Sequence, residues 1–79
     1  MTASWMPLVG AVDVEVHDAR AISIHGDGYV DLLASPPGAE PAPFRVMASA
    51  IGGVPQRGER LRLHLLMSQV DRVERLDPA

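Results

Sequence analysis

The feature that most constrains the fold is an alternation of apolar and polar side chains between Glu59 and Ser68. A period of two over eight or more residues is typical of a β-strand with one buried and one wet face. Pro55 and Gly58 precede the run and supply the turn chemistry that starts it. The alternation predicts an inward set of Leu61, Leu63, Leu65 and Met67 and an outward set of Arg60, Arg62, His64, Leu66 and Ser68.

Shorter alternating stretches before this strand predict more β-structure. Residues 8–17 place valines on an inward face, and after a bulge or bend at residues 18–20 the alternation resumes with Ile22 and Ile24 inward. Gly26-Asp27-Gly28 is a hairpin turn signal, and residues 29–34 form the next strand. A proline-rich loop at 35–43 leads to a strand over Phe44–Ile51, which Gly52-Gly53 ends.

The tail, Gln69 to Asp77, allows two interpretations. Val70, Val73 and Leu76 recur at a spacing of three, which a helix would show, while its valines favour a last strand. We favour the strand. The sequence therefore predicts an all-β fold, a small five- or six-stranded barrel that is OB-like or SH3-like, with no helix. Residues 1–7 are an N-terminal arm and residues 8–77 a single domain.

Composition limits the functional classes. A chain of 79 residues without cysteine has a small core and cannot use disulfides or thiolate metal ligands, so close packing or oligomerisation must help it. No apolar run could span a bilayer, and Met1–Leu8 lacks the charged region of a signal peptide, so we expect a cytoplasmic protein with no membrane contact. Exclusive use of arginine over lysine is consistent with a bacterial source.

Charge divides unevenly along the chain, with −5 over residues 1–40 and +2 over residues 41–79. One interpretation is an OB-type surface that binds single-stranded nucleic acid. The other is internal pairing with the acids of the first strand, Asp13 and Glu15, which we favour because aromatic stacking residues are scarce. The nucleic-acid interpretation uses Arg57, Arg60, Arg62, Arg72, Arg75 and Tyr29.

Catalytic and metal motifs do not occur in the sequence. His17, His25 and His64 lack the close spacing of metal ligands, and no serine lies in a nucleophile motif. We therefore expect no enzyme activity, no cofactor and no metal. The apolar residues expected on outward faces or on the arm predict a non-enzymatic interaction module that self-associates or docks onto a protein partner. This partner interface comprises Trp5, Leu33, Met47, Ile51 and Leu66.

Three features are similar to small OB-like modules, including the TOBE-type domains appended to transporter ATPases. They are a strand after Val9-Gly10, the Gly26-Asp27-Gly28 hairpin, and residues 58–63 (Gly-Glu-Arg-Leu-Arg-Leu) before a closing strand. The resemblance implies a small-ligand-binding regulatory module, with a role in regulation or in oxyanion binding. The Ser-Ala-Arg-Asn motif of the molybdate-binding members is absent.

Overall fold

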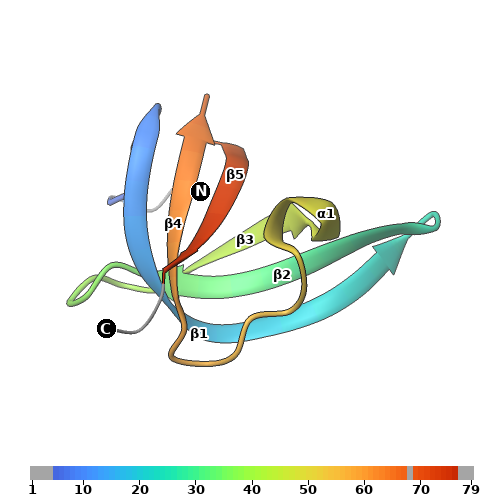
Figure 1. The fold of residues 1–79 in the computed structure, drawn as a ribbon. Helices are drawn as coiled ribbons and strands as arrows, with labels where there is room; N and C mark the ends of the chain where they lie inside the picture. Colours follow the sequence, from blue (N-terminus) through green and yellow to red (C-terminus); the bar gives the residue numbers. More distant parts are fainter. Residues whose placement is uncertain (1–4, 68, 77–79) are drawn as a thin grey trace.

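One five-stranded antiparallel sheet forms the protein, in a computed structural model that describes residues 5–67 and 69–76 (Figure 1). Its order is β3-β2-β1-β4-β5, so the long first strand lies in the centre and pairs with both β2 and β4. The elements are β1 (Gly10–Ile24), β2 (Asp27–Ser35), β3 (Ala42–Met47), α1 (Ala48–Ile51), β4 (Arg60–Leu66) and β5 (Gln69–Leu76).

The core lies on the concave side of this curved sheet and follows the predicted alternation. Leu61 and Leu63 are fully buried, and Leu65 is 4% exposed. The neighbouring strands contribute Val14, Val16, Val30, Leu32, Ala34, Phe44 and Val46. Met67 departs from the prediction, because the chain leaves the sheet after Leu66 and Met67 lies in a turn with 71% of its surface exposed. The tail is a strand, as we favoured, and pairs with β4.

A β-bulge at His17 corrects the predicted orientation of Ile22 and Ile24. Val16 pairs with Ala34 and Asp18 pairs with Leu33, which leaves His17 as the extra residue. One extra residue in a strand exchanges the faces of all positions that follow. Ile22 consequently pairs with Tyr29 on the convex side and is not part of the core cluster. The predicted bulge exists, one residue before the expected 18–20 segment.

The sheet is not closed into a barrel, which corrects that part of the predicted fold. No ladder joins β3 to β5 in the part of the chain that the structure describes, although the two strands approach each other. Both edges are interrupted, since β3 contains Pro43 and the register between β4 and β5 shifts to leave Asp71 unpaired. Proline and bulged charged residues discourage an edge strand from pairing with another chain.

The predicted strand over Phe44–Ile51 is shorter than expected. It ends at Met47, and residues 48–51 form the helical turn α1, which Gly52 ends in a left-handed conformation with φ of 75°. The alternation over residues 44–51 was therefore misleading in its second half. Because the helix turns inward over the sheet, Ile51 is 5% exposed and belongs to the core.

Trp5, in the described part of the N-terminal arm, covers part of the core. Trp5 packs against Phe44 with ring centroids 5.6 Å apart, and its Nε1 donates a hydrogen bond to the Glu40 carbonyl at 2.8 Å. Residues 1–4 of the predicted arm, and Asp77 at the end of the predicted domain, lie outside the described residues. Across residues 5–67 and 69–76, no helix is both long and apolar enough to cross a membrane.

Candidate functional site

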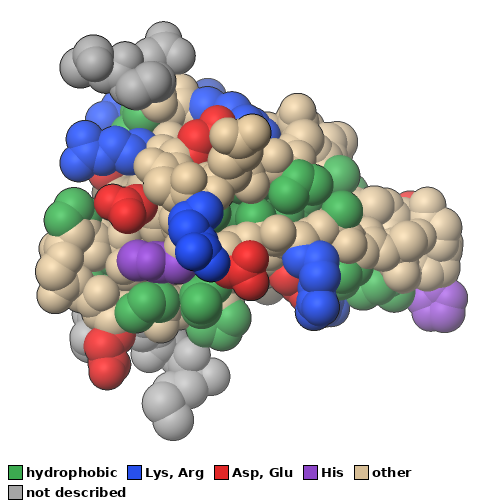
Figure 2. Space-filling model, turned by 90° about the horizontal axis from the view of Figure 1, so that it is seen from below, with side chains coloured by type: hydrophobic (Ala, Val, Ile, Leu, Met, Phe, Trp, Pro, Cys, Tyr) green, Lys and Arg blue, Asp and Glu red, His purple; other side chains and the backbone are tan. Residues whose placement is uncertain are grey.

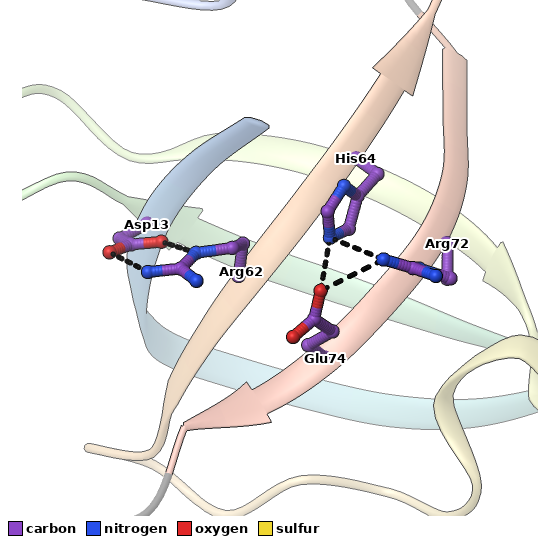
Figure 3. A network of polar contacts seen from close by, with 5 residues as sticks. All are labelled: Asp13, Arg62, His64, Arg72 and Glu74. Carbon is purple, nitrogen blue, oxygen red and sulfur yellow. Dashed lines mark hydrogen bonds and ion pairs between the residues drawn. The ribbon is translucent and has the colours of Figure 1, made fainter. Parts of the chain in front are cut away.

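The pairing of β1 with β4 confirms that Asp13 and Glu15 lie across from the arginines of β4, and one of these pairs forms an ion pair. Asp13 lies opposite Arg62, which donates from Nε to Oδ1 at 2.8 Å and from Nη2 to Oδ2 at 3.2 Å (Figure 3). The hydrogen bond from Arg62 lowers the pKa of Asp13 below its ordinary value, and burial opposes this only in part. Glu15 lies opposite Arg60, as predicted.

A second polar cluster continues the same surface onto β5. His64 Nε2 lies 2.5 Å from Glu74 Oε1, and Arg72 Nη2 donates to the same oxygen at 3.0 Å (Figure 3). A carboxylate has no proton to donate, so His64 must carry its hydrogen on Nε2. The hydrogen bond from His64 is the main cause of the lowered pKa of Glu74. These three side chains therefore form one partly exposed polar cluster on the surface of β4 and β5.

Two further arginines hold loops in place. Arg75 donates to Glu59 Oε1 at 3.0 Å, to the Gly53 carbonyl at 2.7 Å and to the Ile51 carbonyl at 3.4 Å. It therefore ties the end of α1 to the start of β4. Arg57 donates from Nε to the His17 carbonyl at 3.1 Å and so fixes the bulge.

The five arginines of the predicted nucleic-acid surface are thus largely engaged within the protein. Four of them, all except Arg60, donate hydrogen bonds to acids or carbonyls. Figure 2 shows basic and acidic side chains next to one another over one face of the molecule, with no extended area of one sign. Tyr29, the sixth predicted residue, lies on β2 away from β4 and β5. The structure does not bring the predicted six residues together.

The convex side of β1, β2 and β3 carries a different combination, which we call the outer face. Strand register aligns three rows of residues across these strands. The first row is apolar and consists of Ile22, Tyr29 and Met47. The second row is charged and consists of Arg20, Asp31 and Arg45. The third row is mixed and consists of Asp18, Leu33 and Pro43.

One ion pair joins two members of the charged row on the outer face. Arg45 donates to both carboxylate oxygens of Asp31, from Nε at 2.8 Å and from Nη2 at 3.2 Å. This hydrogen bonding lowers the pKa of Asp31, and the charge of Arg20 contributes in the same direction. Asp31 is thus flanked by arginines on both neighbouring strands.

Two shallow hollows lie on this face beside the charged row. One has a volume of about 360 Å³ and is lined by Arg20, Asp31, Leu33 and Pro43, among others. The other has a volume of about 340 Å³ and lies between Pro43 and Arg45. Asp31 and Pro43 line both hollows.

The structure separates the five predicted interface residues. Leu33 (38% exposed) and Met47 (55% exposed) lie on the outer face, and Leu66 (55% exposed) lies at the end of β4. Trp5 is half-buried against Phe44, and Ile51 is buried, so these two stabilise the core. The sequence pattern did not indicate Arg20 and Ile22, because only the bulge at His17 brings them to this face. Arg45 carried no signal beyond its outward position on its strand.

His17 and Ser35 form a polar contact that the sequence did not reveal. His17 Nε2 lies 2.8 Å from Ser35 Oγ, next to a hollow of about 300 Å³ that Glu15 also lines. A serine beside a histidine can act in nucleophilic catalysis, but that chemistry also needs an orienting group and oxyanion donors. Ser35 is 3% exposed, so this contact serves to anchor the bulge to the end of β2.

Metal-binding geometry is not found among the described residues, where no group of three or more His, Cys, Asp or Glu side chains could hold an ion. His17 contacts Ser35 and His64 contacts Glu74, so these two histidines have separate partners. Comparisons of this chain with protein-family models, with curated proteins and with solved structures found no significant match.

Proposed function

We propose that this chain is a non-enzymatic binding module with an OB-like architecture, and that its outer face docks onto a protein partner. One observation carries the proposal: strand register gathers Ile22, Tyr29 and Met47 beside Arg20 and Arg45 on the convex side of the sheet. Tyrosine, methionine and arginine are enriched at protein interfaces, where apolar anchors combine with directional charged contacts.

The architecture supports an OB-like rather than an SH3-like arrangement. In the order β3-β2-β1-β4-β5, a long curved first strand serves both halves of the sheet, and α1 lies between β3 and β4. OB-like modules are five-stranded, partly open barrels that bind ligands over strands 2 and 3. That surface corresponds to the outer face of this protein.

Site-specific photo-crosslinking in the native host tests this proposal. We expect a photoreactive amino acid in place of Met47 to yield one discrete protein adduct, whereas the same group in place of Arg72 yields none. The crosslinked protein is then purified and titrated with this chain. Tyr29→Ala should weaken binding at least tenfold, about 1.4 kcal/mol, because an interface aromatic is lost.

Arg72→Ala is the matched control for that titration, because Arg72 lies on the β4–β5 surface, away from the outer face. The affinity of this variant for the partner should equal that of the unchanged chain. Equal adducts from both positions, or equal affinities of the Tyr29 and Arg72 variants, would overturn the assignment of the outer face. No observation in the structure favours the small-ligand TOBE-like function.

Single-stranded nucleic acid is a second candidate ligand for the outer face. The candidate is favoured by the position of Tyr29 on β2, between the strands that carry Arg20 and Arg45 in the adjacent row. An aromatic ring offers a stacking platform, Arg20 can contact a phosphate, and Arg45 can do so by exchanging its ion pair with Asp31. Two phosphate contacts predict a slope of about −1.4 in log affinity against log salt, whereas the five C-terminal arginines would give about −3.5. Fluorescence anisotropy of a labelled oligothymidine at several salt concentrations measures this slope.

A further inference from the structure

Four large apolar side chains lie exposed at the opposite end of β1 from the hairpin. The start of β1 and the turn between β4 and β5 lie at the same end of the molecule (Figure 1). Gly10 pairs with Leu65 there, so residues just before Gly10 are next to residues just after Leu65. We call this cluster the end patch; it comprises Leu8 (63% exposed), Val9 (60%), Leu66 (55%) and Met67 (71%).

The end patch is large for so small a protein. Together the four residues expose on the order of 400 Å², which is within the range of the largest apolar patch on a typical monomer. Patches of this size commonly mark interaction sites, whereas single exposed apolar residues need no explanation.

The backbone at Met67 provides a second, independent indication. Met67 has a φ of 55°, a left-handed conformation that glycine and asparagine adopt at low cost and methionine does not. The side chain is 71% exposed, so it does not contribute to the core in return. His25 has a similar φ of 51° in the first hairpin, so this conformation occurs at more than one turn of the chain. At Met67 it is combined with an exposed apolar side chain, which a contact outside the monomer would bury.

We propose that two copies of this chain associate through their end patches about a two-fold axis. Such an axis places the same surface on both sides of the contact, so a suitable surface must not bring like charges together. The end patch contains no ionisable side chain. A two-fold contact through the outer face would instead place the charged row of Arg20, Asp31 and Arg45 against the same row of the other copy.

Other ways of pairing two copies are less favourable. Pro43 interrupts the edge of β3, and the unpaired Asp71 interrupts the edge of β5. These features oppose the joining of two sheets edge to edge. Because each copy carries a net charge of −3, a contact without strong apolar burial would be repulsive.

The size of the end patch also indicates what kind of dimer to expect. Two patches bury about 800 Å² in total, less than the roughly 1,200–2,000 Å² of a stable complex, so the dimer should be reversible. It would leave the outer faces of both copies free and present two docking surfaces to a partner. This inference goes beyond the proposed function and does not depend on it.

Sedimentation velocity of the full chain from about 5 μM to about 1 mM tests the inference. We expect the sedimentation coefficient to rise toward that of a dimer over this range. Met67→Asn should raise the dimer dissociation constant at least tenfold, because an apolar side chain is replaced by a polar one. At 5 μM the same variant should melt no lower than the unchanged chain, since asparagine tolerates the left-handed conformation. A structural role for Met67 would instead lower the melting temperature.

Leu33→Ser is the matched control, because Leu33 is an exposed apolar residue on the outer face and its removal should leave dimerisation unchanged. A chain that remains monomeric at 1 mM would overturn the inference, as would equal weakening by both variants. Binding of the monomer to phosphatidylcholine vesicles that Met67→Asn abolishes would assign the end patch to a lipid surface and also overturn it.

Discussion

Leu63 and Leu66 lie three residues apart on β4 and provide a matched test of which side of the sheet holds the core. Leu63 is 0% exposed and Leu66 is 55% exposed. Truncation of a fully buried leucine to alanine costs about 2.5–5 kcal/mol through lost burial and the cavity that remains. The same truncation at the half-exposed Leu66 removes much less buried area and should cost about 0.5–1 kcal/mol. A domain of this length has a total stability of roughly 4–12 kcal/mol, so Leu63→Ala removes a large fraction of it.

Urea unfolding followed by the fluorescence of Trp5, the only tryptophan, measures both variants. Trp5 packs against Phe44, so its emission should change when the core opens. A protein concentration of about 5 μM keeps dimerisation from contributing to the measured stability. We expect the free energy of unfolding to fall by about 2.5–5 kcal/mol for Leu63→Ala and by only about 0.5–1 kcal/mol for Leu66→Ala. Equal losses for the two variants would refute the assignment of the buried face.

Three further predictions concern polar contacts and backbone conformation. Arg75→Met should lower the free energy of unfolding by about 1–2 kcal/mol, because carbonyl groups at the end of α1 lose their donors, whereas Arg72→Met should have a smaller effect in the same urea titration. Asp13→Asn should lower stability at pH 7. Because the folded-state pKa of Asp13 is lowered, its contribution is lost as the pH falls below about 4, and the two proteins should converge in acid titrations once this carboxyl is protonated in the folded protein. Gly26→Ala should lower the stability to thermal unfolding by about 1–2 kcal/mol, because Gly26 has a φ of 83° that alanine adopts at a cost. A Cβ at this position would meet no atom within 4 Å, so the cost is conformational rather than steric. An unchanged melting temperature would contradict this.

The pattern of apolar residues determined the strands and most of the core. The alternation at Leu61, Leu63 and Leu65 correctly predicted their burial, because side chains in a strand alternate between faces whatever lies beyond it. The ion pair between Asp13 and Arg62 was also predictable, since opposite charges on two outward faces favour a shared ladder.

Short-range patterns failed where a strand ended earlier than its alternation. Residues 48–51 continue the apolar and polar spacing of β3, yet they form a helical turn that buries Ile51. A stretch of four residues fits either structure, and only packing against the rest of the protein selects one.

Tertiary structure alone decided the composition of the outer face. The bulge at His17 is held by a hydrogen bond from Arg57 to the His17 carbonyl, and by another from the Gly58 amide to the Val16 carbonyl at 2.8 Å. These contacts join residues about 40 positions apart, so no local window of the sequence contains them. The bulge then reverses the orientation of every later residue of β1, which places Arg20 and Ile22 beside Tyr29 on the convex side. The sequence determined which residues form strands, whereas the register between distant strands decided which of them share a surface.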